Sequence, residues 1–151
     1  MNYLFDTNKV LDYLNKSALA SFINERYTPL DNDNKVCVSI VTVGELKSIA
    51  LQSHWGLRRK NDLAALLQIF SVIDININAI IDLYAEIDAF SQGKLLNLPL
   101  GNSARNTGKN DLWIAATAPY VEAILITTDK DFNHLHEQFV EVVCFDSNKH
   151  K

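Results

Sequence analysis

The stretch Gly108-Lys-Asn-Asp-Leu-Trp-Ile-Ala-Ala-Thr-Ala118 places a single carboxylate, Asp111, where a polar loop becomes an apolar segment. Because residues 112–118 carry almost no polar surface, we expect a helix that is buried against a sheet. An acid in the first turn of such a helix points at a cleft. The helix dipole alone also favours an acid there, by about 0.3–1 kcal/mol. From this stretch alone, a functional acid and a dipole-stabilising acid are equally good interpretations.

The bulk composition is that of one α/β domain. The chain has 151 residues, of which 48% are hydrophobic and 21% charged, and its formal net charge is −4. This charge argues against binding nucleic acid through charge alone, but an acidic metal site would add negative charge that cations offset. Cys37 and Cys144 lie in apolar segments without zinc-ligand spacing, so we expect buried thiols. With no signal peptide or membrane-spanning run visible, we expect a cytoplasmic protein without a membrane partner.

Strand-like and helix-like segments alternate along the chain. Apolar, β-branched runs predict strands at residues 3–5, 36–41, 72–75, 123–127 and 142–145. Helical spacing predicts helices at residues 8–15, 18–27, 43–52, 57–70, 79–90, 111–118 and 132–139, with polar loops at 28–35 and 93–109. Such alternation is typical of βαβ units around a mostly parallel sheet. We expect one domain over residues 1–146 and a short polar tail over 147–151.

Four acids hold similar positions in this pattern. Asp6 directly follows the first expected strand, Glu45 comes four residues after the second, and Asp129 follows the fourth. Asp111 begins the helix that leads into the fourth strand, and Asp131 is a candidate fifth member. Ligands of an open parallel sheet bind beyond the carboxyl ends of its strands. We therefore expect these carboxylates to meet at one edge of the sheet.

Each acid also has a purely structural interpretation. Asp6 and Asp129 can each cap the helix that follows them, and Asn110 can cap the helix that carries Asp111. The segment Thr42-Val-Gly-Glu45 fits a capping box, in which the glutamate bonds back to the cap amide. Taken singly, Glu45 is better explained as a cap, while capping and function explain the other acids equally well.

The set of acids is harder to explain by capping. Carboxylates about 4 Å apart repel one another by about 4 kcal/mol at an effective dielectric constant near 20. A cluster of four would therefore take up protons or bind a cation. Oxygen ligands with few histidines select Mg²⁺ or Mn²⁺ rather than zinc. Such ions can ionise a water and stabilise charge on a phosphodiester, so the sequence predicts metal-assisted phosphodiester hydrolysis.

The acidic segments resemble the motifs of a known family. Leu-Phe-Asp6-Thr-Asn, Val-Gly-Glu45-Leu, the segment 108–118 and Thr-Thr-Asp129-Lys-Asp131-Phe are similar to the acidic motifs of PIN domains, in the same order and over nearly the whole chain. Among PIN domains, the chain is most similar to the VapC toxins of type II toxin–antitoxin systems. The resemblance implies a three-layer α/β/α sandwich and a Mg²⁺- or Mn²⁺-dependent endoribonuclease.

The same resemblance implies roles for individual residues. Asp6, Glu45, Asp111 and Asp129 would hold the metal and position the attacking water, and Asp131 matches a more variable acidic position. Thr7 and either Thr127 or Thr128 could hydrogen-bond the carboxylates or the scissile phosphate. Asn110 could support the ligands, although capping is the favoured interpretation.

The loop before Asp111 departs from the commonest pattern of these toxins, because Leu-Pro-Leu-Gly-Asn-Ser-Ala-Arg-Asn-Thr-Gly precedes Lys109. Arg105 and Lys109 could contact RNA phosphate there, and a solvated loop charge is at least as good an interpretation. The densest basic run, Arg58-Arg59-Lys60, is better explained as a solvated surface than as an RNA contact.

The partners implied by the resemblance are an RNA substrate, a cognate antitoxin and a second copy of the chain that packs through its helical face. Two other functions stay open. One is a receiver-like phosphoacceptor domain, but Asp6 lacks the paired acid that such a domain needs near its first strand. The other is a PIN-like RNA-binding scaffold without activity, against which the complete acidic set argues.

Overall fold

The computed structural model describes residues 1–101, 104–105 and 107–150. Five strands form one sheet in the order β3-β2-β1-β4-β5, and every neighbouring pair is parallel. The strands are β1 (Asn2–Phe5), β2 (Lys35–Ser39), β3 (Ser71–Ile73), β4 (Ala123–Thr127) and β5 (Val142–Cys144). The α/β class and the parallel sheet expected from the sequence are confirmed.

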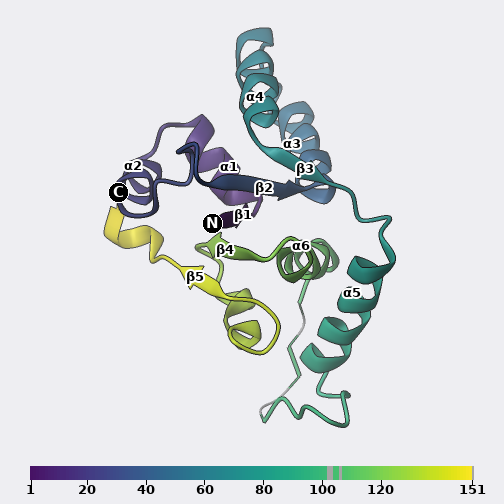
Figure 1. Cartoon of the computed structure of the whole chain (residues 1–151). Helices are drawn as coiled ribbons and strands as arrows, with labels where there is room; N and C mark the ends of the chain where they lie inside the picture. Colours follow the sequence, from purple (N-terminus) through teal and green to yellow (C-terminus); the bar gives the residue numbers. More distant parts are fainter. Residues whose placement is uncertain (102–103, 106, 151) are drawn as a thin grey trace.

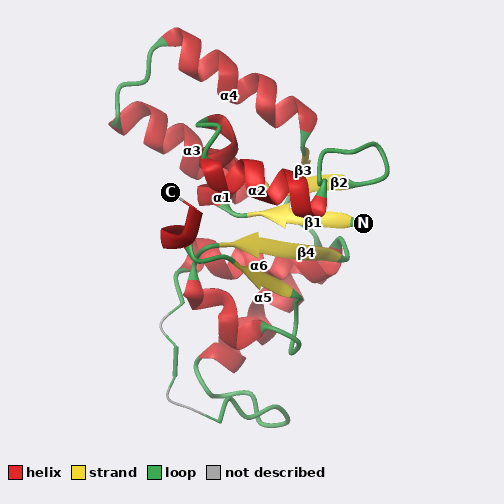
Figure 2. Cartoon of the chain, turned by 90° about the vertical axis from the view of Figure 1, so that its left-hand side faces the viewer, coloured by secondary structure: helices red, strands yellow, loops and turns green. Residues whose placement is uncertain are grey.

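Helices cover both faces of the sheet. They are α1 (Thr7–Leu14), α2 (Ala18–Tyr27), α3 (Ile40–Gln52), α4 (Leu57–Ile69), α5 (Asn78–Ser91) and α6 (Lys109–Tyr120), with short 3₁₀ helices η1 (Lys130–Leu135) and η2 (Ser147–His150). Helices α1 and α2 lie on one face and α5 and α6 on the other, while α3 and α4 extend beyond the β3 edge (Figures 1 and 2). The result is a three-layer α/β/α arrangement.

Helix α6 is buried as its composition predicts. Leu112, Ile114 and the alanines at 115, 116 and 118 are almost inaccessible, and they pack in the cluster that includes β4 and α5. Small alanine side chains let the helix approach the sheet closely. The ring of Trp113 stacks on Tyr84 of α5, with centroids 4.1 Å apart. This packing fixes α6 and the direction of its first turn.

Several element boundaries differ from the expected ones. Strand β2 ends at Ser39 rather than at residue 41, because the Ser39 hydroxyl accepts a hydrogen bond from the backbone N–H of Val41 and so caps α3. The helix expected at residues 132–139 is the shorter 3₁₀ helix η1. Cys37 is buried as expected, but Cys144 is only half-buried, and both thiols are free.

The described part of the tail, η2, lies against α2. The division into a domain over 1–146 and a tail over 147–151 stays a prediction. Among the described residues, no helix combines the length and apolarity needed to cross a membrane.

Candidate active site

The carboxyl ends of β1 and β4 and the first turn of α6 bring the predicted acids together. Carboxylate oxygens of Asp111, Asp129 and Asp131 all lie within 4.8 Å of one another. The charges of Asp6 and Glu45 act on the same Asp111 carboxyl group. The structure therefore gathers all five predicted acids at one edge of the sheet.

Asp111 lies at the centre of this group and is half-buried. Burial, followed by the charges of Asp129, Glu45, Asp6 and Asp131, raises its pKa to about 6. The expectation that Asn110 caps α6 is wrong. Helix α6 begins at Lys109 after Gly108, so Asn110 lies inside the first turn with its side chain exposed.

Asp6 is buried and uses both carboxylate oxygens. Its Oδ1 accepts a hydrogen bond from the backbone N–H of Lys9 at 3.0 Å, so the predicted capping of α1 is confirmed. Its Oδ2 accepts a hydrogen bond from the hydroxyl of Thr127 at 2.5 Å. Burial raises the pKa of Asp6 even though these hydrogen bonds and the charge of Lys9 lower it. Capping and a place in the acidic group thus coexist in one side chain.

Asp129 is held by its neighbours in sequence. Its backbone N–H donates to the Thr127 hydroxyl at 2.9 Å, and its Oδ1 accepts from the backbone N–H of Asp131 at 2.8 Å. The second bond caps η1, as one interpretation of Asp129 predicts. Thr127 is inaccessible and joins Asp6 to Asp129. Thr128 is half-buried, and among the described residues its hydroxyl makes no hydrogen bond to an acid.

The capping-box interpretation of Glu45 is wrong. Helix α3 begins at Ile40, so Thr42 lies inside the helix and Glu45 is in its second turn. Instead, Glu45 Oε1 accepts a hydrogen bond from the Thr7 hydroxyl at 2.9 Å. That bond directs the carboxylate towards the site. A cap would have kept it at the helix terminus.

Lys9 is a site residue that the sequence analysis missed. Its side chain is only 1% exposed, and its ammonium group pairs with Asp12 one turn later in α1. The positive charge of Lys9 lowers the pKa of Asp6. The spacing of Asp6, Lys9 and Asp12 by three residues on a helix is a signal that could have revealed this group.

The predicted basic residues of the loop lie outside the acidic group. Arg105 and Lys109 are both exposed, and the Arg105 backbone N–H donates to the carbonyl of Ser91 at 2.6 Å. Next to the acids, Glu45 and Asn110 line an open groove of about 540 Å³ along α3. Ser48 and Gln52 extend the α3 side of this groove beyond Glu45, and Asn110 contributes from α6.

The donor set suits a hard divalent cation. The three closest side chains offer only carboxylate oxygens, and no histidine or cysteine of the described residues joins them. Oxygen ligands of this kind fit Mg²⁺ or Mn²⁺. A cation there would also offset the repulsion that raises the pKa of Asp111.

Comparison with known proteins gives one family match. A family model described as PIN domain matches residues 3–138. No match to the chain was found among the curated proteins.

Solved structures share the fold over nearly the whole chain. The structure of VapBC2 from Rickettsia felis bound to a DNA fragment from their promoter matches with a TM-score of 0.72 and 22% identity, covering 97% of this chain and 100% of that chain. VapBC-1 from nontypeable Haemophilus influenzae matches with a TM-score of 0.71 and 25% identity, covering 95% and 98%. A toxin–antitoxin complex from Klebsiella pneumoniae matches with a TM-score of 0.61 and 24% identity, covering 93% and 95%.

Proposed function

The chain belongs to the PIN domain family, and on that premise we propose that it is a Mg²⁺- or Mn²⁺-dependent endoribonuclease, the toxin of a type II toxin–antitoxin pair. The observation that carries the proposal is the convergence of Asp111, Asp129 and Asp131 within 4.8 Å, with Asp6 and Glu45 acting on the same point. The family match leaves the receiver-like alternative without support. The complete acidic set favours an active enzyme over an inactive scaffold.

In this proposal Asp6, Glu45, Asp111 and Asp129 hold the metal, and Asp131 is a further ligand. When bound, the metal lowers the pKa of a coordinated water and offsets negative charge on the phosphate. The chain supplies the positioning: Thr127 orients Asp6, Thr7 orients Glu45, and the buried Lys9 helps to keep Asp6 ionised. Asp111, with its pKa of about 6, loses its proton readily near neutral pH and can then bind the cation.

The RNA would enter by the groove that Glu45 and Asn110 line. Lys109 begins α6 beside Asp111, and Arg105 lies in the preceding loop, so both cations can meet backbone phosphates near the cluster. Because the chain has a net charge of −4, its overall electrostatic field does not attract RNA, and such local cations matter more for RNA binding.

The test is RNA cleavage by the purified full chain with Mn²⁺ and with EDTA, on single-stranded and structured RNA. Wild type is expected to cleave only with the metal, and Asp6→Asn and Asp111→Asn to lose cleavage. Arg58→Gln, an exposed change on α4 outside the acidic group, serves as the matched control. Equal cleavage by wild type and both aspartate variants would indicate contamination and reject the catalytic assignment. Stable labelling of Asp6 by acetyl phosphate would favour the receiver-like function.

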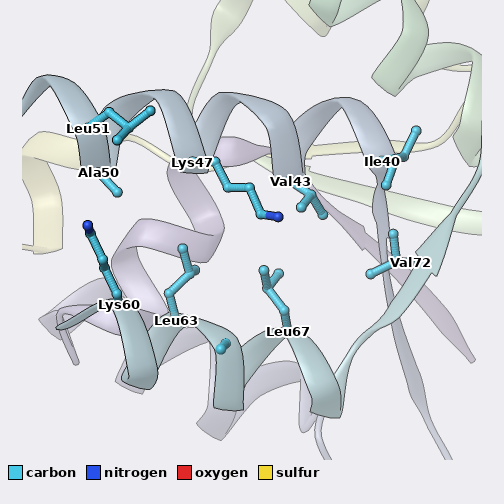
Figure 3. A pocket seen from close by; sticks show the side chains of 10 residues that line it. Ile40, Val43, Lys47, Ala50, Leu51, Lys60, Leu63, Leu67 and Val72 are labelled. Carbon is cyan, nitrogen blue, oxygen red and sulfur yellow. The ribbon is translucent and has the colours of Figure 1, made fainter. Parts of the chain in front are cut away.

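The proposed antitoxin has a candidate binding groove between α3 and α4. This groove, of about 580 Å³, is lined mainly by apolar side chains, which face one another across the two helices in Figure 3. Three of them, Ile40, Leu51 and Val72, are substantially exposed, at 41%, 68% and 42%. Exposed apolar surface of this kind marks a protein interaction site. The structural neighbours include toxin–antitoxin complexes, which supports an antitoxin as the occupant.

The charged residues of the groove indicate which charges the antitoxin segment should carry. Lys47 on α3 and Lys60 on α4 are the charged residues of the lining, and Figure 3 shows both side chains reaching into the space between the helices. We therefore expect an apolar helical segment of the antitoxin that carries acidic residues.

The test measures the affinity of the chain for any small protein that is encoded beside its gene. Lys47→Glu with Lys60→Glu should weaken binding by about 10-fold or more, and Arg58→Glu should not. Equal affinities of the two variants would reject this groove. A homodimer stays a prediction from the family resemblance, and a cytoplasmic location stays a prediction from the sequence.

A further inference from the structure

A partly buried hydrogen bond joins the last turn of α5 to η1. Ser91 Oγ and His134 Nε2 lie 2.8 Å apart, and Ser91 is inaccessible. The His134 ring also lies parallel to the Phe90 ring, with an interplanar angle of 5° and centroids 6.1 Å apart. Two consecutive residues of α5 thus fix both the plane and one edge of this imidazole. Because Ser91 is inaccessible, the pair is unsuited to act as a nucleophile.

The ring also interacts with Asp131, through a hydrogen bond with the Asp131 backbone and through the Asp131 charge. Burial and the charge of Arg105 lower the pKa of His134, while the backbone carbonyl and the charge of Asp131 raise it, and the lowering effects are larger. In the tautomer whose Nε2 accepts, the Ser91 hydroxyl donates to it, and the hydrogen bond with the Asp131 backbone holds the same ring.

The geometry of η1 connects the contact between Ser91 and His134 to the position of Asp131. In a 3₁₀ helix, side chains three residues apart lie on the same face, so His134 and Asp131 share one face of η1. Phe132 and Leu135, also three residues apart, share a second face and are fully buried. A turn this short has few hydrogen bonds of its own, so its rotation depends on such anchors.

We propose that His134 is a positioning residue that ties η1 to the end of α5 and thereby holds the Asp131 carboxylate in the acidic group. The loop before α6 shares the anchor, because the Arg105 N–H donates to the Ser91 carbonyl. This inference rests on the proposed function, in which Asp131 is a metal ligand. Residues that orient ligands in this way typically change metal affinity by about 10–100-fold when they are replaced.

The test uses Mn²⁺ alone as the probe and the full chain throughout. His134→Phe keeps a flat ring against Phe90 but removes both nitrogens. His134→Gln restores an amide that can bond to Ser91, and His54→Phe makes the same change at an exposed histidine outside the acidic group. Calorimetric titration gives the Kd for Mn²⁺ of each variant, of Asp131→Asn and of the double variant His134→Phe with Asp131→Asn. Amide NMR spectra of the metal-free chains report whether η1 has moved.

We expect His134→Phe to weaken Mn²⁺ binding about 10-fold, with partial recovery in His134→Gln and no change in His54→Phe. In the Asp131→Asn background the His134 change should have little further effect, because its action passes through Asp131. The inference would be overturned if His134→Phe bound Mn²⁺ with wild-type affinity. It would also be overturned if His134→Phe lowered the Mn²⁺ affinity of Asp131→Asn as much as it lowers that of wild type.

The same series separates this inference from the proposed function. If Asp111→Asn abolishes Mn²⁺ binding while His134→Phe binds Mn²⁺ like wild type, the proposed metal site is supported and the proposed role of His134 is rejected. Absence of Mn²⁺ binding by wild type would reject the metal site itself. In that case the metal-free spectra decide: displaced Asp131 and Phe132 amide signals in His134→Phe support the anchoring of η1, and unchanged signals overturn it.

Discussion

The hydroxyl of Thr127 donates a 2.5 Å hydrogen bond to the carboxylate of Asp6, across 121 residues of sequence. The bond follows from the register of the sheet. Phe5 of β1 pairs with Ile126 of β4, so Asp6, which follows β1, and Thr127, the last residue of β4, meet at the same edge. Thr127 also accepts the backbone N–H of Asp129. One hydroxyl therefore orients two acids from two strands.

Replacing Thr127 by valine removes this link without changing the side-chain volume much. We expect Thr127→Val to lower the free energy of unfolding by about 1–3 kcal/mol, because it leaves a buried carboxylate oxygen and a backbone N–H without their partner. Mn²⁺ affinity should fall by about 10-fold or more. Urea unfolding and calorimetry measure the two effects. Thr128→Val is the matched control, and equal effects of the two variants would contradict this role of Thr127.

Removing the charge of Asp111 should stabilise the metal-free protein. Its folded-state pKa of about 6 lies above the ordinary aspartate pKa of 3.8, so between these pH values the folded state holds a proton that the unfolded state releases. The free energy of unfolding therefore falls as pH rises from about 4 to 6, and the loss is complete above that range. At neutral pH we expect Asp111→Asn to gain about 1 kcal/mol, since water screens part of the repulsion at this half-buried site.

The measurement for this prediction is thermal unfolding in EDTA across that pH range. The gain of Asp111→Asn over wild type should shrink as the pH falls towards about 4, because the folded wild-type carboxyl is then protonated and no longer repels its neighbours. Asp88→Asn, in α5 and outside the acidic group, should show no such trend. A variant that is less stable than wild type at neutral pH would contradict the electrostatic description of the site.

The affinity for Mn²⁺ should depend on the same proton. Because a metal displaces the proton from Asp111, affinity is expected to rise with pH until about pH 6 to 7 and then level off. Calorimetry in buffers of different ionisation enthalpy would detect the released proton near pH 6. An affinity that is independent of pH from 5 to 7, with no proton release, would contradict the raised pKa of Asp111.

Replacing Lys9 tests whether a charged side chain that is not a metal ligand affects metal binding through the pKa of Asp6. Lys9→Met keeps a long apolar side chain but removes the charge that lowers the pKa of Asp6. We expect Mn²⁺ binding to weaken by about 3–10-fold at neutral pH and to recover at higher pH, since Asp6 then ionises without help. Lys35→Met, an exposed change on β2, is the control. A loss that persists at high pH would indicate a packing defect.

The placement of the acids could be predicted from the sequence because it depends on topology. Alternating strands and helices imply a parallel sheet, and the carboxyl ends of parallel strands meet at one edge. Asp6 and Asp129 directly follow strands, so their convergence needed no knowledge of packing. The burial of α6 was equally visible in its run of apolar residues.

The features that were missed depend on tertiary contacts. Nothing local distinguishes Thr42-Val-Gly-Glu45 from a capping box, and only the cap at Ser39 places it inside α3. Lys9 is of a type that is almost always exposed, and its burial depends on the packing of α1. The bond between Ser91 and His134 joins residues 43 positions apart, and no sequence period connects them.

The most direct test of the central claim is the position of the metal. Crystals of the full chain soaked in Mn²⁺ would show the ion by its anomalous scattering. We predict a peak among the carboxylates of Asp6, Asp111 and Asp129, and its loss in Asp111→Asn crystals. An empty acidic group in crystals that bind Mn²⁺ elsewhere, or a peak that survives Asp111→Asn unchanged, would contradict it.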